Sequence, residues 1–404
     1  MARFLLAPHA PTASLAHVGA CLTVGRELRA RGHQVELAYG GNRPEVIARE
    51  GMPWHPVPEV TPHNEWNPAG WFDSTAELSA MVAAHRTLIA RLGTDVVVTS
   101  SGVAARLACE LENVPELHLN HYLATSRYGR APLVWDNRRR DLLRPRRAAR
   151  VAHSRLRRSI RLAGRSSTPR VVAQVRAQLG LPPAGPEATV GNRDSIVALT
   201  TAPFLDPARD LPAHWRYVGP VLWSASPVDG AAVPARGERP LVYVTQGSTG
   251  DPDLLRLAVR ELADQPVDVL VTTGGLCESA ELERLGPNVR AAALLPGRAC
   301  LEAADAAIVH GGHTTFCEAL RAGTPMVVLP FRQDQIARVN RVERLGAGVG
   351  VWPRPRRQGR IAAAMRRVLE RPAYRQRAQD VAVALRKDWD GARNAADQAE
   401  SLAR

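Results

Sequence analysis

The chain has 404 residues, of which 45% are hydrophobic, and it carries a net charge of +14. A chain of this length exceeds what a single hydrophobic core usually supports, so we expect two domains. No run of about 18 apolar residues is present, which excludes a predicted membrane-spanning helix, and the N-terminal apolar run, broken by Pro8 and His9, resembles a buried strand rather than a signal peptide.

Five cysteines are scattered along the chain without the spacing of metal ligands: Cys21, Cys109, Cys277, Cys300 and Cys317. A sparse, odd set of this kind is typical of reduced thiols in the cytoplasm. We therefore expect a cytoplasmic protein with no disulfide and no metal site.

Most of the positive charge lies in residues 138–170, which contain 13 arginines and 1 aspartate. Such a segment can contact nucleic acid, an anionic lipid surface or an acidic ligand, and a solvated helix is its simplest interpretation. Because no aromatic residues are interleaved with these arginines, we do not expect nucleic-acid binding. A peripheral membrane or anionic contact stays open for this segment.

Short apolar strands alternate with helices along the first half of the chain. The predicted strands are 4–7, 35–39 and 95–99, and the predicted helices are 18–31, 76–92 and 102–111. This order favours an α/β fold with a mainly parallel sheet.

The same alternation restarts after residues 219–240, which are rich in Gly, Pro, Ala and Ser and predict a linker. Strands are expected at 241–244, 267–271, 306–309 and 325–330, with a helix over 253–263. We predict two Rossmann-like, doubly wound parallel-sheet domains over 1–218 and 241–404, with the last helix crossing back to the first domain. Ligands bind such sheets beyond the carboxyl ends of the strands, so we expect an interdomain cleft.

The segment HGGHTT, residues 310–315, follows the strand over 306–309 and precedes a helix. Gly311 and Gly312 let the backbone approach a ligand closely, and a helix start offers unpaired N–H groups at the positive end of its dipole. This pattern predicts a phosphate or diphosphate site. The alternative is a helix start capped by a threonine after a glycine turn.

Residues 310–335, HGGHTTFCEALRAGTPMVVLPFRQDQ, together with NRVERLGAG at 340–348, resemble the donor-binding signature of nucleotide-sugar glycosyltransferases. These enzymes have two Rossmann-like domains, the GT-B fold, and include bacterial macrolide-type natural-product enzymes and the UDP-sugar transferases. GSTGDPDLL near 247 and HWRYVGPVLW near 214 are similar to the family as well. The resemblance implies a sugar-transferring enzyme with a UDP- or TDP-sugar as cosubstrate and no cofactor.

The resemblance also implies roles for individual donor-site residues. Glu318 would bind the ribose hydroxyls, and Asp334 and Gln335 would bind the sugar. The diphosphate would be held by Gly247, Ser248, His310, Gly311, Gly312, Thr314 and Thr315. Residues 293–297 lack the tryptophan that stacks on uracil in many relatives, so the nucleotide stays open, and Arg338 replaces the family's usual asparagine.

His17 lies in the register at which the family carries its general base, sixteen residues before His33. The resemblance therefore implies an inverting, metal-independent transfer in which His17 deprotonates an acceptor hydroxyl. Many relatives have an aspartate after the 95–99 strand that orients this base, where this chain has Ser100 and Ser101. Either a serine orients His17, another acid such as Asp73 does so, or His17 acts unassisted.

The acceptor is a small molecule, in our interpretation a natural product, with a glycolipid as a further possibility. Aromatic residues of the N-terminal loops are candidates for its site: Trp66, Trp71, Phe72 and Trp135. Two other functions stay open, a nucleotide-sugar epimerase on the same fold and a catalytically idle nucleotide-binding relative. The sequence does not distinguish a monomer from a homodimer.

Overall fold

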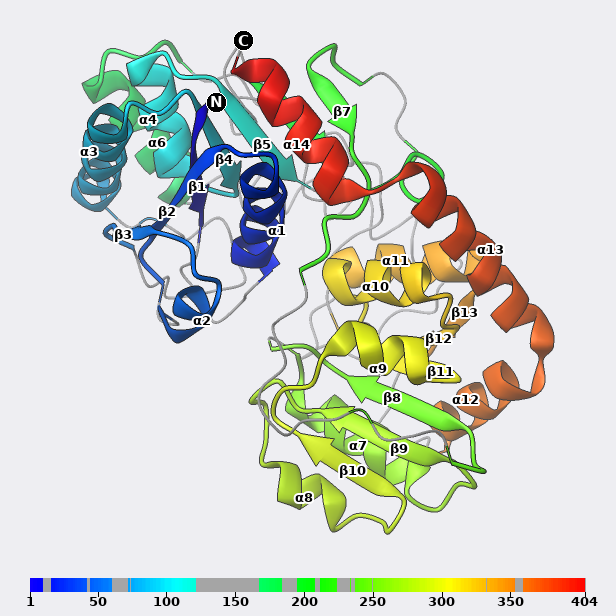
Figure 1. The fold of residues 1–404 in the computed structure, drawn as a ribbon. Helices are drawn as coiled ribbons and strands as arrows, with labels where there is room; N and C mark the ends of the chain where they lie inside the picture. Colours follow the sequence, from blue (N-terminus) through cyan, green and yellow to red (C-terminus); the bar gives the residue numbers. More distant parts are fainter. Residues whose placement is uncertain are drawn as a thin grey trace, which may run out of the picture. The chain divides into compact units, whose positions relative to one another are not determined.

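The computed structural model describes residues 1–9, 16–41, 44–59, 72, 74–120, 167–183, 195–207, 211–223, 233, 237–248, 250–331, 333–352 and 359–403, with the backbone alone at 167–169, 333 and 334. The chain forms two compact units. The first contains β1 to β7 together with the last helix, α14, and the second contains β8 to β13 with α7 to α13 (Figure 1).

The first unit is built on a seven-stranded sheet with the order β3-β2-β1-β4-β5-β6-β7. All its pairs are parallel, with Leu5 opposite both Glu36 and Val97. Its strands are β1 (Arg3–Pro8), β2 (Gln34–Tyr39), β3 (Trp54–Pro56), β4 (Val96–Ser100), β5 (Glu116–Asn120), β6 (Ile196–Leu199) and β7 (Trp215–Tyr217). The strand order reverses between β1 and β4.

Helices cover both faces of this sheet because buried apolar residues alternate between its two sides. One face packs against α1 (Ala16–Ala30), α2 (Pro44–Arg49) and α14 (Gly391–Leu402), and the other against α3 (Thr75–Leu92), α4 (Val103–Glu112) and α6 (Ser167–Gln178). α14 lies beside α1 (Figure 1). Arg31 donates hydrogen bonds to Asp397 and Glu400 of α14, at 2.7 and 2.8 Å.

The second unit has a six-stranded parallel sheet with the order β10-β9-β8-β11-β12-β13. Its strands are β8 (Leu241–Thr245), β9 (Asp268–Thr272), β10 (Val289–Ala292), β11 (Ala306–Val309), β12 (Met326–Val328) and β13 (Gly348–Gly350). The helices are α7 (Pro252–Leu262), α8 (Ser279–Glu283), α9 (Gly297–Ala303), α10 (His313–Ala322), α11 (Gln333–Leu345), α12 (Arg360–Glu370) and α13 (Pro372–Asp388). Here the strand order reverses between β8 and β11.

Both sheets confirm the predicted α/β class with doubly wound parallel strands. Helix ends follow local chemistry: Ser74 caps α3 by accepting a hydrogen bond from the Glu77 N–H, at 3.1 Å, and Gly93 ends it in a left-handed conformation. In each unit, the connections on either side of the strand-order reversal diverge and expose the carboxyl ends of two neighbouring strands. Parallel α/β sheets bind ligands at this place.

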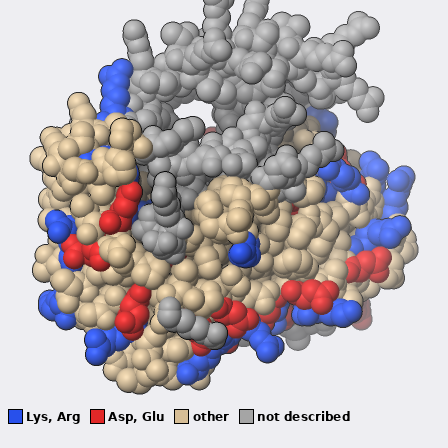
Figure 2. All heavy atoms as spheres, turned by 90° about the horizontal axis from the view of Figure 1, so that it is seen from above, with Lys and Arg blue, Asp and Glu red and all other residues tan. Residues whose placement is uncertain are grey.

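Basic and acidic side chains are interspersed over the described surface in Figure 2. This mixed surface fits the sequence, since residues 138–170 carry most of the net charge and the rest of the chain is nearly neutral. Within the described residues, no helix combines the length and apolarity that crossing a membrane requires.

Candidate functional site

Glycines line the carboxyl ends of β8, β9 and β11 in the second unit. Gly247, Gly274 and Gly311 adopt φ values of 65°, 64° and 86°, a left-handed conformation that favours glycine. A Cβ on Gly274 would lie 2.5 Å from the Gly247 carbonyl oxygen, and one on Gly247 would lie 2.9 Å from the ring of His310. Three loops therefore approach each other at distances that side chains would prevent. Gly274 was missed in the sequence, although TTGG follows a predicted strand as clearly as HGG does.

Helix α10 starts at this glycine-lined end without a side-chain cap. Its N-cap residue is Gly312, which has an extended backbone and, as a glycine, offers no side-chain hydrogen bond to the first turn. This corrects the alternative in which a threonine caps the helix, since Thr314 and Thr315 lie inside the first turn. The first N–H groups of a helix lack intrahelical acceptors and carry partial positive charge, so this end can bind an anion.

The His310 side chain lies directly over the HGG turn. Its imidazole occupies the space into which a side chain at Gly312 would project, and it is 6% exposed. Its ring centroid is 6.2 Å from that of Phe331. The His310-Gly311-Gly312 turn thus lies against the adjacent loop, which contains Gly247 and the partly buried Ser248.

Helix α11 brings the second predicted pair to the same turn. Gln335 is 3% exposed, and its side-chain oxygen accepts a hydrogen bond from the Phe331 N–H at 2.8 Å. A Cβ on Gly311 would lie 3.4 Å from that of Gln335, so the two segments are in contact. Asp334 lies in the first turn of α11, and its side chain is outside the described residues. Arg338 is buried one turn further along, at 4% exposure.

Glu318 lies on α10, where it faces the start of α9. A Cβ on Gly297 would be 3.7 Å from a Glu318 carboxyl oxygen and 3.8 Å from the Tyr243 hydroxyl. Burial raises the pKa of Glu318 from its ordinary value of 4.5 to about 8, and the more distant Arg298 only partly opposes this shift. The raised pKa favours the neutral form of the carboxyl group, which can donate as well as accept a hydrogen bond.

Gln246 was not identified from the sequence, yet it closes β8 immediately before Gly247. Its side chain is fully buried, and neither its amide nitrogen nor its amide oxygen has a hydrogen-bond partner among the described residues. Burying an unsatisfied amide costs about 1–3 kcal/mol. The available sequence signal was that a glutamine directly follows the largely apolar run LVYVT.

In the first unit, His17 and Ser100 meet where the strand order reverses. His17 lies in the first turn of α1, after β1, and Ser100 is the last residue of β4. The imidazole Nδ1 is 2.9 Å from the Ser100 hydroxyl oxygen. The structure therefore joins the predicted base to one of the two serines that replace the family's aspartate.

Of the four aromatic residues predicted to contact the acceptor, the structure describes Phe72 alone. Phe72 is fully buried in the core between the sheet and α3, which corrects its prediction as an acceptor contact. An apolar ring preceding an amphipathic helix packs inward as readily as it lines a ligand site. Trp66, Trp71 and Trp135 lie outside the described residues, as does most of the 138–170 segment.

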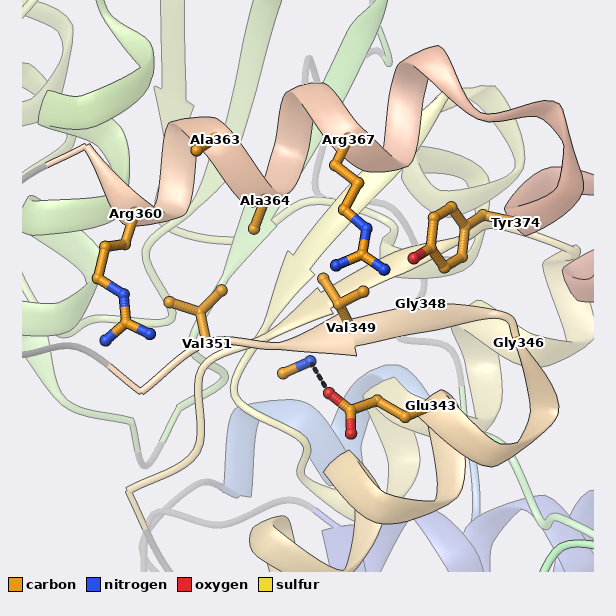
Figure 3. Close-up of a pocket in the computed structure, with 11 residues that line it drawn as sticks. Glu343, Gly346, Gly348, Val349, Val351, Arg360, Ala363, Ala364, Arg367 and Tyr374 are labelled. Atoms are coloured by element: carbon orange, nitrogen blue, oxygen red, sulfur yellow. Dashed lines mark hydrogen bonds between the residues drawn. The ribbon is translucent and has the colours of Figure 1, made fainter. Parts of the chain in front are cut away.

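A separate pocket of about 570 Å³ lies at the β13 edge of the second unit (Figure 3). Arg360 and Arg367 of α12 project toward it, and the Arg367 guanidinium lies 5.8 Å from the ring centroid of Tyr374. Glu343 accepts a hydrogen bond from the edge N–H of Gly350, at 3.0 Å. The described residues that line this pocket include none of those predicted for the donor site.

The chain is similar in sequence to known sugar-transferring enzymes. Residues 257–388 match the family model described as erythromycin biosynthesis protein CIII-like, C-terminal domain. A PGL/p-HBAD biosynthesis glycosyltransferase of Mycobacterium tuberculosis is 28% identical over 397 residues, which cover 94% of this chain and 88% of that protein. The 4'-demethylrebeccamycin synthase of Lentzea aerocolonigenes is 28% identical over 385 residues, covering 89% and 90%.

Solved structures share the complete fold. The glycosyltransferase of kitacinnamycin superposes with a TM-score of 0.75 at 21% identity, covering 99% of this chain and 98% of that one. The glycosyltransferase VinC, solved in complex with DTDP, gives a TM-score of 0.68 at 18% identity and covers 99% of both chains.

The two doubly wound sheets and the superposed structures show the GT-B fold. The similarity in sequence to named glycosyltransferases supports a sugar-transferring enzyme. Within that class, the chain is related to the glycosyltransferases of natural-product biosynthesis, which confirms the resemblance seen in the donor-binding signature.

The raised pKa of Glu318 predicts that stability falls as pH rises. Between about pH 4.5 and pH 8 the folded protein keeps a proton on this carboxyl that the unfolded chain has lost, so the free energy of unfolding decreases across this window. In Glu318→Gln this contribution is absent. Relative to wild type, the free energy of unfolding of the variant should be higher at pH 9 than at pH 5 by on the order of 1 kcal/mol, a value reduced for the partial solvent contact of this group. Thermal unfolding at both pH values measures this difference. Glu370→Gln, an exposed change on α12, is the control, and parallel pH curves for wild type and Glu318→Gln would contradict the shift.

The unsatisfied amide of Gln246 predicts a stabilising substitution. Gln246→Met keeps the length of the side chain and removes both polar groups, so it should raise the free energy of unfolding by about 1 kcal/mol. Chemical denaturation measures this change, with the exposed Gln379→Met on α13 as the control. A destabilised Gln246→Met variant would mean that the amide is hydrogen-bonded in solution.

Proposed function

We propose that this enzyme transfers a sugar from a UDP- or TDP-sugar to a hydroxyl group of a natural-product acceptor, with inversion at the anomeric carbon and without a metal ion. His17 is the general base. The observation that carries the proposal is the uncapped start of α10 at the glycine-lined ends of β8, β9 and β11.

The donor half of the proposal rests on the chemistry of that end. A nucleoside diphosphate carries negative charge on its two phosphates, and backbone N–H groups, a helix dipole and the His310 imidazole are suitable partners for it. Glu318 lies one helical turn beyond Thr314, where it would accept and donate hydrogen bonds with the ribose hydroxyls. Asp334 and Gln335 would bind hydroxyls of the sugar.

The catalytic half rests on His17. The acceptor hydroxyl would give its proton to this imidazole, and its oxygen would form a bond to the anomeric carbon. The bond from that carbon to the diphosphate oxygen breaks in the same step, and the diphosphate leaves with the electron pair. Because the acceptor attacks opposite the leaving group in a single displacement, the anomeric configuration inverts.

The acceptor class is proposed from the relatives. One is named a 4'-demethylrebeccamycin synthase and another a PGL/p-HBAD biosynthesis glycosyltransferase. We accordingly place the acceptor among natural products that carry a free hydroxyl group, with a glycolipid as the second class to be tested.

Calorimetric titration with UDP and with TDP tests the donor site. At least one of the two should bind, because both present the diphosphate to the start of α10, and the tighter ligand identifies the donor class. Glu318→Ala should weaken that binding through loss of its contact with the ribose. If neither nucleotide binds the wild-type protein at moderate salt, the donor proposal is wrong.

His17→Ala should lower kcat by about 100-fold or more, as expected for loss of a general base, while nucleotide affinity stays unchanged. The rate is measured as release of the nucleoside diphosphate with an acceptor found by screening, and the anomeric configuration of the product is read by NMR. His55→Ala on the edge strand β3 serves as a matched histidine control. Full activity in His17→Ala would remove this residue from the mechanism.

A further inference from the structure

Ser100 makes hydrogen bonds near both ends of the connection between β1 and α1. Its backbone oxygen accepts a hydrogen bond from the His9 N–H, at 2.9 Å, directly after β1. Its hydroxyl oxygen lies 2.9 Å from Nδ1 of His17, in the first turn of α1. One residue at the end of β4 therefore fixes where the chain leaves the sheet and where the helix with His17 begins.

The backbone around Ser100 leaves it little freedom to move. The side chain of Ser100 is 4% exposed, so its hydrogen bonds are largely shielded from water. The next residue, Ser101, has a φ of 59°, and a Cβ on Gly102 would lie 2.7 Å from the Ala7 carbonyl oxygen. A left-handed residue followed by a close approach to β1 restrains the backbone next to Ser100.

A third group bears on the direction of the hydrogen bond between Ser100 and His17. The Ser100 hydroxyl has a single hydrogen, and the Leu119 carbonyl oxygen on β5 lies 3.4 Å from it in a donor geometry. When the hydroxyl donates to Leu119, its oxygen can only accept from His17, so Nδ1 carries the proton. The lone pair of the neutral ring is then on Nε2, the nitrogen that a general base needs for the acceptor proton.

We propose that Ser100 is the positioning residue of His17, in a relay from the Leu119 carbonyl through the Ser100 hydroxyl to Nδ1. The inference rests on the proposed role of His17 as base and explains how this chain orients it without the family's aspartate. A hydroxyl fixes the tautomer and the ring orientation but adds no charge. It therefore orients the base without the electrostatic support that a carboxylate would give to the imidazolium.

A matched pair of variants isolates the hydroxyl. Ser100→Thr keeps it, whereas Ser100→Val has nearly the same volume and shape without it. The valine variant should lose about 10- to 100-fold in kcat relative to the threonine variant, with equal affinity for the nucleotide and equal thermal stability. Ser100→Ala should show the same loss, and Ser101→Ala should leave kcat unchanged. Equal kcat values for the threonine and valine variants would overturn the proposal.

The tautomer can be read in the wild-type protein, without any acceptor. Nitrogen-15 NMR of histidine-labelled protein, with the His17 signals assigned by their loss in His17→Ala, should show Nδ1 protonated and Nε2 unprotonated in the neutral ring. An Nε2-protonated ring in wild type would overturn the relay. Wild-type transfer activity and its loss in His17→Ala report on the proposed function separately, so a failure of the relay and a failure of the function give different results.

Discussion

In both sheets of this protein, there is one place where the connections that follow two neighbouring parallel strands run in opposite directions. β1 and β4 do so in the first unit, and β8 and β11 in the second. Because the following helices pack on opposite faces, the loops between them diverge and leave the carboxyl ends of the strands uncovered. His17 and Ser100 lie at the first of these places, and the HGG turn and Gly247 lie at the second. The positions of His17, Ser100, Gly247 and the HGG turn depend on this reversal.

In the second unit, several features near the glycine-lined strand ends lower stability. α10 begins without a capping side chain, Gln246 is buried with its amide unsatisfied, and Glu318 is held in surroundings that disfavour its charge. Each of these features is locally unfavourable and involves a group that can hydrogen-bond to a polar ligand. Natural sequences depart from locally optimal choices mainly at functional sites. Gly247, Gly274 and Gly311 belong to the same pattern. Glycine loses more conformational entropy on folding than other residues, but it lets these backbone segments come close to one another.

In the first unit, by contrast, the proposed base His17 is held in place by its neighbours. Ser100 contacts both ends of the connection before α1, and α14 packs beside α1 through the interactions of Arg31. A helix fixed along its length and at its start gives the His17 ring a defined orientation. The fold thus places a preorganised side chain in one unit and an anion-accepting backbone in the other, which are the two elements that transfer of a sugar from a diphosphate requires.

The sequence by itself determined the α/β class, the order of the main strands and helices, and the glycine turn before α10, because short apolar runs, helical spacing and glycine turns are local features. It missed Gln246 and Gly274, and it assigned Phe72 to a ligand site although the ring belongs to the core. It also left three explanations for the missing aspartate beside His17. Only the tertiary structure showed where Gln246, Gly274 and Phe72 lie, and it placed Ser100 beside His17. The 2.9 Å contact between His17 and Ser100 arises because β1 pairs with β4. These two residues are 83 positions apart in the sequence, and no local pattern encodes a contact over such a separation.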